Sequence, residues 1–145
     1  MTLTRFEDWP ARLERYLRIS ARRPFDWAQH NCCLFATSGV AVITGVNPAD
    51  LFDQDFTDRQ TAGDALRAFA GGGVLETAQK IGRALDCPEV PVLSARRGDV
   101  VYTSSAPHGG LGLVDLDGRF AVFLTRGEGL ARIKLAACDR AWKVG

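Results

Sequence analysis

Apolar residues recur at helical spacing through the first half of the chain. Over 4–21 they stand three and four positions apart, with arginines on the opposite face, which predicts an amphipathic first helix. Asn31 is a suitable N-cap, and the run after it is apolar on nearly every side up to Gly45, which is typical of a buried central helix. Two further helices are predicted over 61–70 and 74–85.

After Pro91 the hydrophobic period changes from helical to alternating. This pattern predicts strands over the segments 99–103, 111–116, 119–124, 129–135 and 140–144. Asp117-Gly118 lies between two of them and predicts a tight hairpin turn. Because the helices come first and the strands follow, we expect an α+β fold, in which N-terminal helices pack on a C-terminal antiparallel sheet of about five strands.

Length and charge limit the classes of protein. The 145 residues suit one domain, 1–145, with a core large enough to fold without disulfides or a structural metal. A net charge of +1 gives no general attraction to nucleic acid or acidic membranes. The N-terminus lacks the pattern of a signal peptide, and no apolar run reaches the roughly 18 residues of a membrane span. We therefore expect a soluble protein made in the cytoplasm, with no nucleic-acid partner and no membrane insertion.

The cysteines do not favour a disulfide or metal framework. Cys32 and Cys33 are adjacent, and adjacent cysteines rarely bridge each other, whereas Cys87 and Cys138 stand alone. A structural zinc site needs paired Cys or His residues at two places in the chain. The acidic stretch 50–58 lacks the glycine and final glutamate of a calcium loop. We expect no metal and no cofactor.

Cys32 is the candidate nucleophile. If Asn31 caps the second helix, Cys32 lies in its first turn, where the helix dipole stabilises a thiolate and lowers the thiol pKa. A thiol nucleophile also needs a base, and the chain has two histidines, His30 and His108. The alternative is that Cys32 and Cys33 are small buried apolar residues and that both histidines are loop residues.

Four short motifs occur in an order shared with a known family. They are Phe25-x-Trp27, Asn31-Cys32-Cys33-Leu34-Phe35, Arg97-Gly98-Asp99-Val100-Val101 and Leu111-Gly112-Leu113-Val114. In this order they resemble the NlpC-type branch of papain-like cysteine peptidases. More narrowly, the opening around Trp27 and Cys32, the strand that begins at Asp99 and the terminal Ala141-Trp142-Lys143-Val144-Gly145 are similar to short phage and prophage proteins usually encoded among tail genes.

The resemblance implies a papain-like NlpC-type fold, with Cys32 at the nucleophile position and Asp99 as the structural aspartate that opens the first strand of the sheet. Gly110 stands at the position of the family's histidine, and His108 lies two residues earlier. Such an offset displaces a side chain by about 6–7 Å along a strand. His108 reaches the thiol only if the chain bulges at the glycines beside it.

Two other family positions are replaced. Phe25 stands where the family has a tyrosine, and it has no hydroxyl group. The family places a polar residue that orients the histidine on the next strand, yet 120–123 offers only apolar side chains.

The resemblance implies two functions. In the first, the protein is a structural or adaptor module of a phage tail tip or baseplate, a pseudoenzyme located in the virion tail with other tail-tip and hub proteins as partners. In the alternative, it is a cysteine peptidase or amidase that cleaves peptide amides of peptidoglycan through Cys32, with His108 or His30 as the base. Its substrate would then be cell-wall peptide.

Overall fold

The computed structural model describes residues 2–52, 56–105, 110–127 and 129–145. Its helices are α1 (Trp9–Ser20), α2 (Cys32–Thr44), α3 (Arg59–Ala70) and α4 (Val74–Ala84), with short 3-10 turns η1 (Pro48–Leu51), η2 (Val92–Ser94) and η3 (Leu135–Ala137). The strands are β1 (Glu89–Val90), β2 (Val100–Thr103), β3 (Gly110–Val114), β4 (Phe120–Leu124), β5 (Leu130–Lys134) and β6 (Arg140–Trp142). None of the described helices is long and apolar enough to cross a membrane.

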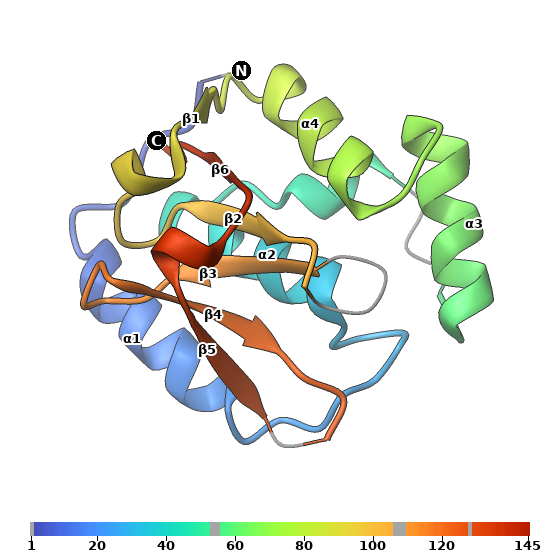
Figure 1. The fold of residues 1–145 in the computed structure, drawn as a ribbon, viewed down its shortest axis with the longest axis horizontal. Helices are drawn as coiled ribbons and strands as arrows, with labels where there is room; N and C mark the ends of the chain where they lie inside the picture. Colours follow the sequence, from blue (N-terminus) through green and yellow to red (C-terminus); the bar gives the residue numbers. More distant parts are fainter. Residues whose placement is uncertain (1, 53–55, 106–109, 128) are drawn as a thin grey trace.

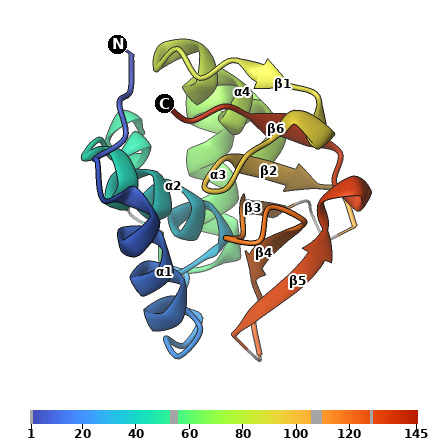
Figure 2. The same ribbon diagram turned by 90° about the vertical axis from the view of Figure 1, so that its left-hand side faces the viewer.

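The strands form one antiparallel sheet in the order β1-β6-β2-β3-β4-β5. Figures 1 and 2 show the helices gathered on one side of this sheet, with α2 between α1 and the strands. The predicted α+β class and the helices-first order are confirmed. The additional strand is β1, which pairs with β6 through Glu89 and Val90. Two residues between Pro88 and Pro91 are too short to show an alternating pattern.

Two helices begin at other residues than expected. α1 starts at Trp9 and has a proline in its first turn, so the apolar residues before it belong to an extended segment. α3 starts at Arg59 because Asp58 accepts a hydrogen bond from the Thr61 backbone, while the Thr61 hydroxyl interacts with Asp58 in return. The acidic stretch predicted as a loop includes Asp53 and Asp55, which lie outside the described residues.

The main core lies between α2 and the sheet. Phe35 and Ile43 of α2 and Leu113 of β3 are fully buried in it, together with residues from α1 and the chain ends. Gly39 permits this close approach, since a Cβ there would lie 2.3 Å from the Leu113 side chain. The opposite face of the sheet carries a second apolar layer, covered in part by Leu135 of η3.

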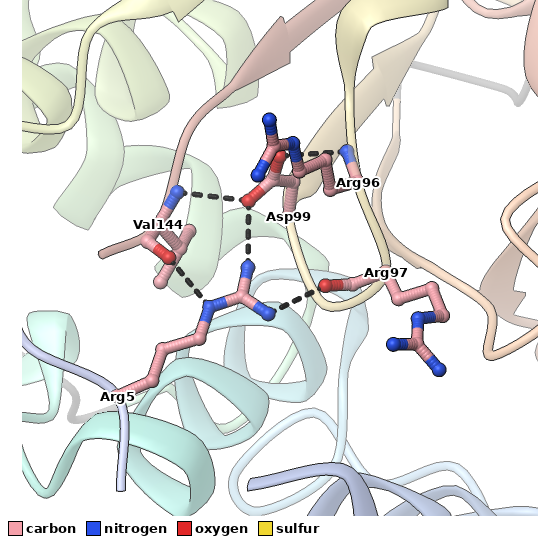
Figure 3. A network of polar contacts seen from close by, with 5 residues as sticks. All are labelled: Arg5, Arg96, Arg97, Asp99 and Val144. Atoms are coloured by element: carbon pink, nitrogen blue, oxygen red, sulfur yellow. Dashed lines mark hydrogen bonds and ion pairs between the residues drawn. The ribbon is translucent and has the colours of Figure 1, made fainter. Parts of the chain in front are cut away.

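A buried ion pair ties both ends of the chain to the start of β2 (Figure 3). Arg5 donates to the Asp99 carboxylate at 2.8 Å, to the Val144 carbonyl at 2.8 Å and to the Arg97 carbonyl at 2.6 Å. Asp99 also accepts from the backbone N–H groups of Val144 and Arg96, at 2.9 and 2.8 Å. Burial raises the pKa of Asp99, against the opposing effect of these N–H groups and of Arg5. Removing this carboxylate from water costs free energy, and in the folded chain both of its oxygens accept hydrogen bonds.

Candidate functional site

The start of α2 is fixed by the buried side chain of Asn31. Its Oδ1 accepts a hydrogen bond from the Leu34 backbone at 2.9 Å, and its Nδ2 donates to the Trp27 carbonyl at 2.7 Å. The first bond caps the helix, and the second fastens the preceding loop to it. Cys32 is consequently the first residue of α2, as the sequence predicts.

The Cys32 thiol faces the backbone of β3. Backbone N–H groups of Leu111, Cys33 and Cys32 itself act on the sulfur and favour its thiolate form. Among the four cysteines, all of which are free thiols, Cys32 is the partly exposed one. The thiol therefore lies at the junction of the helix N-terminus with the first residues of β3.

The electrostatic state of this thiol differs from the sequence-based expectation. Burial raises the pKa of Cys32, and the three N–H groups only oppose this effect. The expected lowering of the pKa was wrong because packing against β3 removes water from the sulfur. Burial likewise raises the pKa of Cys33, and it raises those of Cys87 and Cys138 to about 11.

His30 packs against α1, whereas Cys32 faces β3. Only 2% of the surface of His30 is exposed, and its ring meets that of Phe35 edge-on, with centroids 6.3 Å apart. Burial and the nearby charge of Arg23 lower the pKa of His30, and a hydrogen bond with the Ser20 backbone opposes this effect only in part. Its Nε2 has no hydrogen-bond partner within the described residues. The structure thus gives His30 and Cys32 different neighbours, although they are two residues apart.

His108, the other candidate base, lies outside the described residues. The described chain resumes at Gly110, which begins β3 opposite Thr103 of β2. Leu111, whose backbone contacts the Cys32 thiol, follows three residues after His108 in the sequence.

The positions that differ from the peptidase pattern are occupied by apolar side chains. β4 runs beside β3, with Phe123 opposite Gly112, and all five of its residues are apolar. Phe25 packs edge-on against Trp27, with ring centroids 5.0 Å apart. Within the described part of the chain, no three His, Cys, Asp or Glu side chains gather where they could hold a metal ion.

Arg126 contacts the aromatic residues that precede α2. The sequence did not predict this contact. Its guanidinium lies over Phe25 and Trp27, 5.6 and 5.4 Å from the ring centroids. Arg126 follows β4 and the two aromatic residues precede α2, so the contact joins distant parts of the chain. A lone arginine in a turn carries no periodic signal that would reveal such a contact.

Comparisons with known proteins agree with this geometry. The fold is similar to the crystal structure of the NlpC/p60 domain of peptidoglycan hydrolase SagA, with a TM-score of 0.56 and 14% identity over 92% of this chain and 97% of that one. This likeness confirms the papain-like NlpC-type fold. A comparison with curated proteins gives no match. A family model matches residues 4–144, and the chain therefore belongs to the family described as domain of unknown function DUF6950.

Proposed function

We propose that this protein is a structural or adaptor module of a phage tail tip or baseplate, built on the NlpC-type fold, in which the hydrolase reaction is lost. The tail assignment is supported by the sequence resemblance around Cys32, Asp99 and the terminal segment. The loss of the reaction is supported by the pKa of Cys32, which burial raises, and by β4, which has no polar side chain.

The motif residues divide into two groups that favour this proposal. Those that build the fold keep their roles, since Asn31 caps α2 and Asp99 holds Arg5 and Val144 in the buried network. Those that would serve the reaction are replaced, since Phe25 has no hydroxyl and β4 has no polar side chain. A chain that keeps its scaffold and replaces its reactive groups fits a binding or structural role.

Particle analysis tests the tail assignment. The protein should co-purify with phage or prophage particles through a density gradient, at a fixed ratio to a tail-hub protein. A host cytoplasmic enzyme added to the lysate serves as the control for trapped material. Recovery of the chain only as free protein, with none in the particles, would overturn the assignment.

A cysteine hydrolase acting on peptide amides of peptidoglycan is a second candidate, favoured by the contact between Cys32 and Leu111. Three N–H groups around the sulfur would stabilise a thiolate and could hold the oxyanion of an attacked carbonyl. His108 would take the thiol proton and pass it to the leaving amine, and water would then hydrolyse the thioester to restore the thiol. His30 in this role would first have to leave Ser20 and Phe35.

Alkylation rates separate the two candidates. If the reaction is lost, iodoacetamide near neutral pH should label Cys32 slowly, at a rate comparable with Cys87 and Cys138, because its raised pKa leaves little thiolate. Peptide mass spectrometry over time measures the three rates in one sample. A Cys32 rate at least about a hundredfold above the others would instead support the hydrolase. A Cys32→Ser variant identifies the labelled peptide.

A further inference from the structure

Phe25, Trp27 and Arg126 form a charged aromatic corner at the Cys32 end of α2. The two rings stand nearly perpendicular, at 89°, and the guanidinium lies within 5.6 Å of both centroids. Both rings are half-buried and Arg126 is exposed. Stacking of this kind restricts a guanidinium while leaving its N–H edge accessible.

The corner and the thiol lie at the same end of the fold. On the helix side, the Trp27 carbonyl is bonded to Asn31, which directly precedes Cys32. On the sheet side, the thiol contacts Leu111 near the start of β3. β4 runs antiparallel to β3, so its last residue lies beside that start, and Arg126 follows two residues later.

The guanidinium of Arg126 contacts rings and has no ion-pair partner among the residues that the structure describes. Asp26, the acidic residue between the two aromatic positions, uses its Oδ1 to accept from the Ala28 backbone. A guanidinium offers a planar set of N–H donors that matches the two oxygens of a carboxylate.

We propose that Arg126 binds a free carboxylate of a peptide that lies across Phe25 and Trp27 beside Cys32. The inference deepens the proposed function, because it makes the retained NlpC-type site a binding site for acidic peptide, whether or not Cys32 reacts. The rings would contact the peptide chain next to the carboxylate, and Arg126 would select peptides that carry this charge. In the alternative, Arg126 binds no peptide, and its stacking on Phe25 and Trp27 only holds the loop before α2 in place.

Indole N–H signals in two-dimensional NMR spectra of the full chain test the proposal. The probe is the tripeptide alanyl-glutamyl-lysine, compared with the same tripeptide in which every carboxylate is a carboxamide. The acidic tripeptide should shift the Trp27 signal saturably, and the amide should bind at least about tenfold more weakly, the loss expected for a charge-assisted hydrogen bond. Binding should weaken as salt is added.

Arg126→Gln should reduce the affinity for the acidic tripeptide to that for the amide, and Arg126→Lys should restore part of it. Arg97→Gln is the matched control, because Arg97 also stacks on a tryptophan, 5.2 Å from the Trp9 centroid, but outside the corner. An unchanged signal of the buried Trp142 shows that each variant is folded. No shift of Trp27 with either tripeptide, or equal binding by Arg126→Gln, overturns the proposal.

Failure of this inference is distinguishable from failure of the proposed function. Loss of peptide binding leaves particle association and the Cys32 labelling rate unaffected. Conversely, a chain that is absent from particles can still bind the tripeptide at the corner.

Discussion

Replacing Asp99 with alanine will lower the free energy of unfolding by about 3–5 kcal/mol, because it leaves a buried charge without its partner. Arg5 is only 14% exposed at its side chain, and its guanidinium would keep two carbonyl acceptors but lose the carboxylate. The backbone N–H groups of Val144 and Arg96 would lose their acceptor as well. Urea denaturation followed by circular dichroism measures the loss.

Two further variants separate charge from hydrogen bonding in this network. Asp99→Asn retains one acceptor oxygen but presents N–H donors to a neighbour that is itself a donor, so its loss should be intermediate. Glu14→Ala removes an exposed carboxylate that is paired with Arg18 on the surface of α1, and it should leave the denaturation midpoint essentially unchanged. An Asp99→Ala variant as stable as Glu14→Ala would contradict the assigned role.

Replacing Phe35 with alanine will cost about 3–5 kcal/mol of unfolding free energy, through lost burial and the cavity that remains. Phe35 has no exposed surface and touches two other rings, that of Tyr16 at 5.7 Å between centroids and that of His30 at 6.3 Å. The Tyr16 hydroxyl also donates to the Phe35 carbonyl at 2.7 Å, which limits how far α1 can move to fill the space.

Phe6→Ala is the matched control for this substitution. Phe6 is 38% exposed and stacks under the Arg12 guanidinium at the surface, so its removal creates no enclosed cavity. Its effect on the denaturation midpoint should be much smaller. Equal losses for Phe6→Ala and Phe35→Ala would show that the α1–α2 contact is not the tightly packed part of the core.

The helices and the main strands could be predicted because each has a local signal. The central helix is the clearest case: Asn31 caps it, Gly45 ends it in a left-handed conformation, and the apolar run between them is buried. The hairpin at Asp117 is similar, since its carboxylate accepts from the backbone N–H groups of Arg119 and Phe120. β1 could not be predicted, because two residues show no period and their pairing depends on β6.

The position of Cys32 at the start of α2 could be predicted from the sequence, but the direction in which its pKa shifts could not. The place of Cys32 follows from its cap, a local feature. Its raised pKa follows from burial in the folded chain, which a linear sequence does not display. The direction in which His30 points is likewise set by Ser20 and Phe35, through packing of α1 on α2. The pairing of Cys32 with His108 remains a prediction.

The place of β6 in the sheet has a consequence for biosynthesis. β6 is translated after the other five strands, yet it lies between β1 and β2. Val144, just beyond it, completes the hydrogen bonds of Asp99. While these residues are still inside the ribosome, β1 has no neighbour in the sheet and Asp99 lacks the N–H donor of Val144. The emerging chain can therefore assemble its helices and the β2–β5 meander early, but must await the final strand before it closes into the native sheet.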